Sequence, residues 1–589
     1  MKKIKSNYIF SELSLFIPLK TKLKLLSISK YYQKKFNISL LHYQFYHEIN
    51  IYINKDRKFS SDYFYYFINK FSKIIKEEFI ENIILEKLDK VKNIYIKLNA
   101  YNEYTNKILE KNLNNVSLIF PINNQLENIN FHYNKYKISS LIFKGNRTIF
   151  LNDFMVNKII YFIYSDNIQK LVIKDCILSK ENYYFKVLLQ KLYSNQNLIL
   201  LDFSKNFQLM TFDKKYLNLF LLNNNIQNFK INLSSNSSKK TFNELQYFKT
   251  MKNLKQISII CDLDFHFEIL KKLIFHSKNL KSITLSNIII SDSFDLSKFI
   301  NLEEFSIINC QGKIYEFNIK SLLKKLKIKN VNIKEEILYK LLNNSKSSLE
   351  YFEFNQNFSN NKIPNCIYSL NKLKYLKTVK LDLPFILNKF NFHKIEELKI
   401  KFNEKINFPQ NLKEIKILSL QNYNSINKNS LINILTFENL TKLSLKNIKL
   451  KGEIISILGN NLKKLKFLKS LKLNNNFDSL EEDINLKEKL LINLKFCNFL
   501  QILSIKNNNI DNKLLGILFF QFENMPILHK LDISNNIIDE FGISFFYLFP
   551  NYLKNLKKLF IKGNHLSSIQ ELEQKTNILY KLKNIIIIN

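Results

Sequence analysis

The sequence has almost no arginine, glycine or alanine. Of its 89 basic residues only Arg57 and Arg147 are arginine, Ala100 is the single alanine, and 589 residues include seven glycines and no tryptophan. The abundant residues (lysine, asparagine, isoleucine, phenylalanine and tyrosine) have A/T-rich codons, as in a low-GC genome, so the net charge of +39 is weaker evidence of function than its size suggests. Sequence-specific reading of nucleic acid relies on the two-pronged hydrogen bonding of arginine. We therefore expect no specific nucleic-acid partner and only non-specific attraction to polyanions.

Cysteines and long apolar runs are also scarce. The five cysteines are scattered and none lies in a C-x-x-C pair, which argues against a disulfide framework and against a zinc site. No apolar run reaches the length needed to cross a membrane. The basic start, MKKIKSNYIF, is followed by Glu12 and by no small-residue cleavage site of a signal peptide. We expect an intracellular protein, cytoplasmic with the nucleus left open, and no membrane partner.

The common catalytic motifs are missing as well. The chain has no G-x-x-x-x-G-K-[ST], no G-x-G-x-x-G, no H-E-x-x-H and no G-x-S-x-G. Its eight histidines form no ligand cluster, and the acid pair Glu303 and Glu304 fits the solvated edge of a strand. We therefore expect no enzyme, no cofactor and no metal site.

A phrase of eleven residues recurs along the chain. LQILSIKNNNI (500–510), LHKLDISNNII (528–538) and LKKLFIKGNHL (556–566) place Leu503, Leu531 and Leu559 at two steps of 28 residues. We call this central apolar residue of each phrase the anchor. Two weaker phrases, around Ile94 and Val116, are candidates for the start of the array. The remaining anchors, which bring the total to 17 intervals over 444 residues, are Leu141, Leu171, Leu201, Phe229, Ile257, Ile283, Phe305, Leu326, Phe352, Val379, Leu398, Leu418, Leu443, Leu471 and Ile585.

Each phrase has the pattern of a short strand followed by a turn. In LDISNN, Leu531 and Ile533 alternate with polar residues, so their side chains point into a core and the others point away. The fifth residue after the anchor is a small polar side chain that can satisfy backbone groups of the turn. This position holds Asn146, Cys176, Asn206, Cys310, Asn357, Asn403, Asn476, Asn508, Asn536 and Asn564.

Between the phrases the apolar spacing is helical. Leu514, Leu515, Leu518, Phe519 and Phe522 predict a helix that begins after Asp511 and ends before Pro526, and the next unit repeats the plan with Phe541, Phe545 and Leu548 before Pro550. Some central intervals are only 19 to 22 residues long, which leaves room for a turn or a short 3₁₀ segment and predicts uneven curvature there.

This strand-plus-helix period resembles the leucine-rich repeats of the ribonuclease-inhibitor-like class. The resemblance implies an α/β solenoid, a curved right-handed horseshoe with a parallel sheet on its concave face, of about 18–20 units over residues 91–589. It also implies binding of another protein. A GTPase-activating protein is the enzymatic exception expected in this fold class, and Arg147, in KGNRTI, is its only candidate charge-stabilising arginine.

Residues 1–90 are expected to form a small α-helical N-terminal domain, with an amphipathic helical pattern over residues 61–90. Residues 8–36 are similar to an F-box, with the ending Ile28, Ser29, Lys30, Tyr31 in place of the family's Val-Ser-Lys-aromatic ending. The resemblance implies docking on a Skp-type adaptor of a cullin ubiquitin ligase; the alternative is a helical cap for the first repeat. The adaptor-binding residues would be Leu13, Ile17, Leu23, Leu26, Ile28 and Tyr31.

Lysines accumulate at the outward strand positions of the later units. Thirteen lysines and four acids, Glu353, Asp382, Glu397 and Asp532, occupy the residues one before, one after and three after the anchors from Leu326 to Leu559. The earlier units have four lysines and two acids at the same positions. This excess predicts that the concave face binds an acidic protein surface or tail, the alternative being lysines that only keep the chain soluble. The expected partner-binding residues are Lys442, Lys446, Lys472, Lys506, Lys530, Lys558 and Lys562, and the others are Lys325, Lys327, Lys329, Lys380, Lys399 and Lys401.

Two functions from different classes fit these features. The chain is either the substrate-recognition subunit of a cullin-type ubiquitin ligase or a stand-alone leucine-rich repeat binding scaffold. Only the first requires the surface of residues 8–36 to be free.

Overall fold

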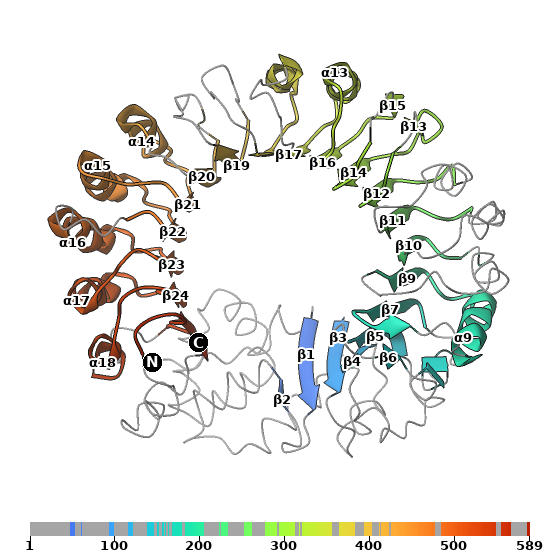
Figure 1. The fold of residues 1–589 in the computed structure, drawn as a ribbon, viewed down its shortest axis with the longest axis horizontal. Coiled ribbons are helices and arrows are strands. Elements are labelled where there is room, and N and C mark those ends of the chain that lie inside the picture. Colours follow the sequence, from blue (N-terminus) through green and yellow to red (C-terminus); the bar gives the residue numbers. More distant parts are fainter. Residues whose placement is uncertain are drawn as a thin grey trace, which may run out of the picture. The chain divides into compact units, whose positions relative to one another are not determined.

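The repeated phrases form parallel strands in the computed structural model of the protein (Figure 1). The chain divides into two compact units, Met1–Leu280 and Lys281–Asn589, here called unit 1 and unit 2. The structure describes residues 48–53, 60–61, 93–98, 116–121, 138–145, 150–151, 156–157, 159–160, 163, 168–178, 183–204, 223, 225–233, 252–261, 277–290, 294–312, 317–318, 321–355, 365–382, 394–402, 412, 414–422, 426–477, 484–548, 555–566 and 586–588.

Unit 1 contains a parallel ladder that starts earlier than the sequence pattern indicated. Strand β1 pairs in parallel with β3, which pairs with β4, and the ladder continues through β5, β7, β9 and β10 to β11. Strand β2 runs antiparallel to β1, and the short strands β6 and β8 pair with each other. The elements are β1 (Glu48–Ile53), β2 (Ser60–Ser61), β3 (Asn93–Leu98), β4 (Val116–Pro121), β5 (Ile138–Lys144), β6 (Phe150–Leu151), β7 (Lys170–Lys174), β8 (Ile177–Leu178), α9 (Tyr183–Ser194), β9 (Leu200–Phe203), β10 (Asn228–Leu233) and β11 (Gln256–Cys261).

Unit 2 continues the same plan. Its strands pair in parallel in the order β12, β14, β16 to β26. They line the inner side of the arc, and the helices lie on its outer side (Figure 1). Its elements are β12 (Ser282–Ser286), β13 (Phe294–Asp295), β14 (Glu304–Ile308), β15 (Phe317–Asn318), β16 (Lys325–Lys329), α13 (Glu335–Asn344), β17 (Tyr351–Asn355), η6 (Asn365–Lys372), β18 (Thr378–Asp382), β19 (Glu397–Phe402), β20 (Ile417–Asn422), α14 (Lys428–Ile434), β21 (Lys442–Lys446), α15 (Glu453–Asn461), η8 (Leu462–Lys464), β22 (Ser470–Asn474), α16 (Ile484–Asn493), η10 (Leu494–Phe496), β23 (Ile502–Ser504), α17 (Asn512–Gln521), η11 (Phe522–Asn524), β24 (Lys530–Asp532), α18 (Glu540–Leu548), β25 (Lys558–Phe560) and β26 (Ile586–Ile588).

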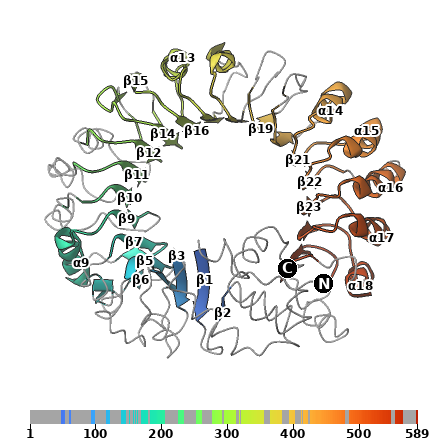
Figure 2. The ribbon, with the colours of Figure 1, turned by 180° about the vertical axis from the view of Figure 1, so that it is seen from behind.

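The anchors stack in register, as the spacing predicted. Leu503 lies opposite Leu531, which lies opposite Leu559, and all three are fully buried. The strands of unit 2 line the inner side of its arc and the helices its outer side, so the anchors fill the layer between them (Figures 1 and 2). The solenoid architecture is thereby confirmed within each unit.

The register corrects the frame at both ends of the array. Leu559 pairs with Ile587 rather than with Ile585, which restores the 28-residue step of the preceding units. At the other end, Ile96 and Leu118 share the register of Leu141, two residues beyond Ile94 and Val116, and the register shifts between β4 and β5. Because side chains alternate along a strand, an error of two residues leaves the inward face unchanged and is not visible in the apolar pattern.

The helices of the last units begin and end near the expected residues. Helix α17 begins after Asp511, whose carboxylate caps it by accepting a 2.8 Å hydrogen bond from the amide of Leu514. Helix α18 differs from the predicted face, because Phe541 and Leu548 are 66% and 58% exposed. Ile543 and Phe546 are the buried residues instead, and the Phe546 ring packs against Phe519 of α17.

The short central units contain strands where we expected a turn or a 3₁₀ segment. On the outer side of β14, the two-residue strands β13 and β15 pair in parallel, Phe294 with Phe317. Units that are too short for a helix thus form a second, short sheet. An extended chain covers about twice the distance per residue of a helix, so fewer residues are enough to cross the outer side of the unit.

Buried asparagines connect the last units through the turn after each strand. The side chain of Asn508 accepts hydrogen bonds from the amides of Asn476 (2.8 Å) and Phe477 (3.1 Å) and donates to the carbonyl of Leu473 in the preceding unit. Asn536 provides the same contact to the amide of Asn508, at 2.9 Å. The predicted role of this position is confirmed.

Cysteine replaces asparagine in two earlier turns, as predicted. The thiol of Cys176 donates to the carbonyl of Lys174 (3.0 Å), and Cys310 is 2% exposed in the same position. The remaining expected members, Asn146, Asn206, Asn357 and Asn403, lie outside the described residues.

The residue just before this position has a left-handed backbone that the sequence analysis did not anticipate. Asn475, Asn507 and Asn535 have φ values of 58°, 57° and 53°, and Gly563 takes the equivalent place with φ of 74°. Asparagine and glycine tolerate this conformation better than other residues. Repetition of Asn-Asn in these phrases therefore has two separate causes.

Candidate interaction surface

The outward positions of the unit 2 strands form a concave face whose two halves differ in charge. In the half from β14 to β19, lysines form ion pairs with acids on neighbouring strands or, for Lys399, on the same strand. In the half from β21 to β25, lysines dominate.

Glu353 is the centre of the first half. Its carboxylate forms ion pairs with Lys329 and with Lys327 (3.5 Å), and it accepts a hydrogen bond from the Tyr351 hydroxyl (2.5 Å). Burial by itself raises the pKa of the Glu353 carboxyl, but the hydrogen bonds from Lys329 and Tyr351 and the charge of Lys327 outweigh it and keep the pKa below its usual value. Glu353 therefore stays ionised, and its single negative charge is shared by two of the predicted concave lysines.

Other lysines of this half are also paired. Only Lys380 lacks a carboxylate within ion-pair distance among the described residues; its ammonium lies 4.9 Å from the centre of the Tyr351 ring. Burial, and after it the charge of Lys399, lowers the pKa of Lys380. The remaining pairs are Lys325 with Glu304 (3.8 Å), Lys399 with Glu397 (2.6 Å) and Lys401 with Asp382 (3.2 Å).

The second half holds the seven lysines expected to bind a partner, here called the C-terminal basic face. Within the described part of the chain none of these lysines has a carboxylate at ion-pair distance, and Lys530 instead lies 4.6 Å from the centre of the Phe560 ring. Asp532 is the acid among the described outward residues of this half, and it is occupied by the Ser504 hydroxyl (3.3 Å) and the Ser534 amide (3.2 Å). The face consists of Lys442, Lys446, Lys472, Lys506, Lys530, Lys558 and Lys562.

Mostly small polar residues separate these lysines. Ser444, Ser470, Asn474, Ser504 and Ser534 occupy outward positions between them, and the Ser504 hydroxyl donates to the Asn474 side chain at 2.8 Å. The partly exposed Ile502 and Phe560 are the apolar residues among the described outward positions of β21 to β25. The face therefore combines positive charge with short polar side chains and two apolar ones.

His529 lies at the edge of this face, among several lysines. It precedes Lys530 and is partly buried. Burial, followed by the charges of Lys557, Lys558 and Lys530, lowers the pKa of His529 below its ordinary value. The positive potential that disfavours a protonated imidazole would favour a carboxylate at the same place.

A ladder of alternating charge, which the sequence analysis missed, runs along the edge where the strands of unit 2 begin. Glu303 is flanked by Lys281 (3.5 Å) and Lys324 (2.9 Å), and its pKa is lowered first by the hydrogen bond from Lys324. Every member lies two residues before an anchor, so the alternation could have been read from the aligned phrases. The members are Lys281, Glu303, Lys324, Glu350, Lys377, Glu396 and Lys416.

The alternation stops at Lys416, just before β20, and the first lysine of the C-terminal basic face is Lys442 on the next strand, β21. The next described residues at this position are Thr441, Lys469, Gln501, His529 and Lys557, with no acid among them. At the described positions, the acids therefore end at Glu396 on the edge and, apart from Asp532, at Glu397 on the concave face.

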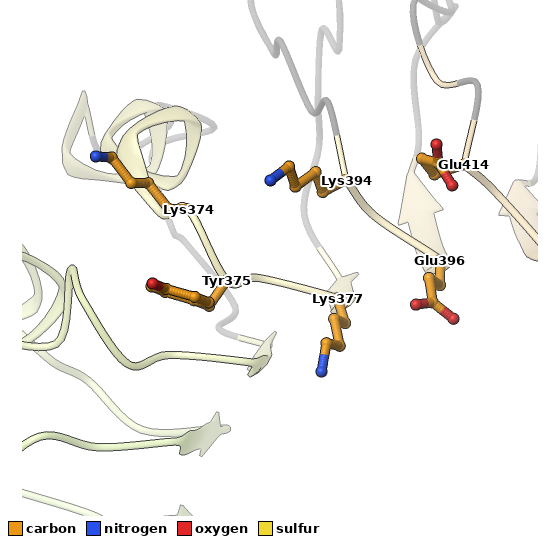
Figure 3. A pocket seen from close by; sticks show the side chains of 6 residues that line it. All are labelled: Lys374, Tyr375, Lys377, Lys394, Glu396 and Glu414. Atoms are coloured by element: carbon orange, nitrogen blue, oxygen red, sulfur yellow. The ribbon is translucent and has the colours of Figure 1, made fainter.

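A shallow hollow of about 370 Å³ lies beside the ladder, lined by Lys374, Tyr375, Lys377, Lys394, Glu396 and Glu414. Its side chains do not converge on a common point: Lys377 and Glu396 point away from Lys394 and Glu414 (Figure 3). Glu396 already forms an ion pair with Lys416 of the alternating charges, at 2.9 Å. The hollow has no arrangement of groups that favours a particular ligand.

Groups suited to catalysis or metal binding do not cluster in the described residues. The five cysteines are buried and form no disulfide, and burial raises the pKa of the Cys497 thiol to about 12 and that of Cys310 to about 11. No group of three His, Cys, Asp or Glu residues in the described ranges could hold a metal ion. Among the described helices none is both long and apolar enough to cross a membrane.

The F-box-like residues Leu13, Ile17, Leu23, Leu26, Ile28 and Tyr31 lie outside the described residues, as do Arg147 and residues 62–90.

No family model and no curated protein matches the chain. Solved structures with similarity to it include a leucine-rich repeat protein of Leptospira interrogans (16% identity, 86% of this chain and 97% of that chain covered, TM-score 0.30). Two others are the TLR13–ssRNA13 complex (16% identity, 86% and 79% covered, TM-score 0.41) and the mouse RP105/MD-1 complex (15% identity, 86% and 76% covered, TM-score 0.39). At these identities and TM-scores, the similarities carry no argument about function. The stacked strands, the buried asparagine turns and the outer helices identify the fold as a leucine-rich repeat solenoid.

Proposed function

We propose that the protein is a binding scaffold and that the C-terminal basic face binds an acidic surface or tail of a protein partner. The observation that carries this proposal is the contrast between the two halves of the concave face. Five of the six earlier lysines have a carboxylate partner, whereas none of the seven later ones has one among the described residues.

The contrast matters because unpaired like charges destabilise a fold. Neighbouring strands are about 4.8 Å apart, well inside the screening length of about 8 Å at physiological salt. Lys530 and Lys558, which lie opposite each other on β24 and β25, therefore repel each other. The same chain places acids among its lysines on β17 to β19, so genomic bias toward lysine does not account for their loss downstream.

Concave placement also favours binding over simple solubility. A surface that curves around a partner focuses the field of its charges and speeds the association of an oppositely charged molecule. Lysines that serve only solubility would act equally well on the outer side of the solenoid.

The test is charge reversal of Lys472, Lys506 and Lys530 to glutamate in the full chain, with a labelled oligoglutamate peptide as the probe. We expect the triple variant to bind the probe at least about tenfold more weakly, since three favourable contacts become repulsive. A matched control reverses Lys340, Lys463 and Lys489, which are exposed on the outer elements α13, η8 and α16.

The control separates the effect of the concave lysines on binding from the effect of the net charge, because both variants change the charge of the chain by the same amount. Equal loss in the two variants would show that the peptide senses only the overall charge of +39. Undiminished, salt-independent binding by the concave variant would mean that these lysines serve solubility and that the binding face lies elsewhere.

A ubiquitin-ligase role for this scaffold is a finer proposal that rests on residues 8–36 alone. If this segment is an F-box, the protein should recover a Skp-type adaptor and a cullin from cell extract. Leu26→Asp combined with Ile28→Asp should then lose both, while circular dichroism of the array stays unchanged. If the folded wild-type protein recovers neither partner, the ubiquitin-ligase role fails and the protein is a stand-alone scaffold.

A GTPase-activating role would depend on Arg147, and no described residue supports it.

A further inference from the structure

Three lysines of the C-terminal basic face repeat on every second strand. Lys446, Lys506 and Lys562 each lie three residues after an anchor, and all three are exposed. The units between them have Asn474 and Ser534 at the equivalent position. The lysines thus form a row that crosses the strands along the edge where the strands end.

Backbone hydrogen bonds hold this row in register. The carbonyl of Lys506 accepts from the amide of Asn475 in the preceding unit (2.9 Å), and the carbonyl of Lys562 accepts from the amide of Asn535 (2.7 Å). The spacing of the row is therefore that of the parallel ladder, about 4.8 Å per strand. Successive lysines are about 10 Å apart, and the outer two are about 19 Å apart.

A row of asparagine amides runs beside the lysines. The side chain of Asn475 donates to that of Asn447 (3.0 Å), and the side chain of Asn507 donates to that of Asn475. Each amide nitrogen carries two N–H groups, and these contacts use one of them. The edge therefore presents ammonium groups and amide donors together, which is chemistry suited to carboxylates.

The spacing distinguishes between shapes of acidic partner. One turn of an α-helix rises about 5.4 Å, so two turns, about 10.8 Å, nearly match two strands. In an extended strand, side chains on one face repeat about every 6.7 Å and fall out of phase with successive lysines. A polyproline II chain repeats about every 9.3 Å and matches the lysines as well, but it has no side chain on the same face between two repeats. Only the helix has an intervening turn, whose carboxylates reach the amide row.

We propose that the C-terminal basic face binds an acidic α-helix that lies across strands β21 to β25. Carboxylates seven and fourteen residues apart on one helical face meet Lys446, Lys506 and Lys562, and carboxylates on the intervening turns meet the amide row. This inference rests on the proposed function and specifies the shape of its acidic partner. No single contact is strong, since exposed ion pairs are individually weak, and affinity comes from several contacts made by one pre-ordered face.

The test uses two helix-stabilised peptides of equal composition and net charge with the full-length protein. The first has glutamates alternately three and four residues apart, so that they lie on one face at successive turns, and the second has the same number at every fifth residue, which distributes the carboxylates around the helix. A third peptide of the same charge contains prolines and glutamate at every third residue, so that it forms a polyproline II chain with a repeat of about 9.3 Å.

We expect the first peptide to bind at least about tenfold more tightly than the other two, and replacement of Lys446, Lys506 and Lys562 by glutamine to remove this preference. The control variant replaces Lys340, Lys463 and Lys489 by glutamine and should keep the preference. Equal affinity for all three peptides, or tighter binding of the proline-containing peptide, overturns the helical partner and leaves the acidic partner standing. If no peptide binds, the proposed function fails together with the inference.

Discussion

At the scale of single residues, adjacent asparagines after each strand perform different tasks. In Asn507-Asn508, the first residue takes a left-handed backbone at φ of 57°, and the second is fully buried and hydrogen-bonds the turn of the preceding unit. A chain rich in asparagine for compositional reasons thus uses it where its backbone tolerance and its amide are both required.

Asn508→Ala should lower the free energy of unfolding by about 2–4 kcal/mol. The change leaves the amides of Asn476 and Phe477 and the carbonyl of Leu473 buried without their hydrogen bonds. The measurement is the shift of the urea unfolding midpoint relative to the wild type.

The control for this change is Asn460→Ala on the exposed side of α15. We expect that variant to lie within about 0.5 kcal/mol of the wild type. A similar small effect for Asn508→Ala would contradict the role of the buried amide in joining the units.

At the scale of elements, each unit depends on its neighbours for a complete core. Strand β24 contains only Lys530–Asp532, and its anchor Leu531 is fully buried between Leu503 and Leu559. Stability in such an array is close to a sum of unit and interface terms, so a defect acts mainly on the units that touch it.

Leu531→Asp should therefore open the units around β24 while distant units stay folded. The change buries a carboxylate without a partner between two apolar anchors, at a cost of several kcal/mol. Limited proteolysis followed by mass spectrometry should show new cleavage near β23 to β25, and circular dichroism should retain most of the signal.

Asp532→Ala is the matched change on the outward side of the same strand. It removes two hydrogen bonds from Ser504 and Ser534 but no core contact, so its cleavage pattern should resemble that of the wild type. Cleavage of Leu531→Asp spread uniformly over the chain would argue against nearest-neighbour cooperativity.

At the scale of the whole molecule, the net charge of +39 has to be divided into neutralised and unneutralised parts. Ion pairs such as Lys329 with Glu353 and Lys324 with Glu303 neutralise charge on the earlier strands of unit 2. The C-terminal basic face keeps its charge, and this regional difference, rather than the total, is what carries the functional proposal.

The repeat and the identity of the inward residues were predictable from the sequence. Seventeen of the expected anchors were aligned correctly because burial of one strand face forces an apolar residue at a fixed place in every unit. Ile585 was wrong because the last phrase, NIIIIN, is apolar at consecutive positions and does not distinguish Ile585 from Ile587. The outward face of α18 was misjudged because Phe541 and Leu548 are apolar without being buried.

The sequence by itself therefore determined the period, the strand face that is buried and the turn chemistry, since these are local patterns that recur in each unit. The tertiary structure decided which lysines and acids of different units on the concave face come within ion-pair distance. Lys329 and Glu353 are 24 positions apart in the chain, and only the parallel stacking of β16 on β17 brings them together. Coulomb interactions depend on distance in space, so a count of charges in the sequence cannot separate a paired lysine from an unpaired one.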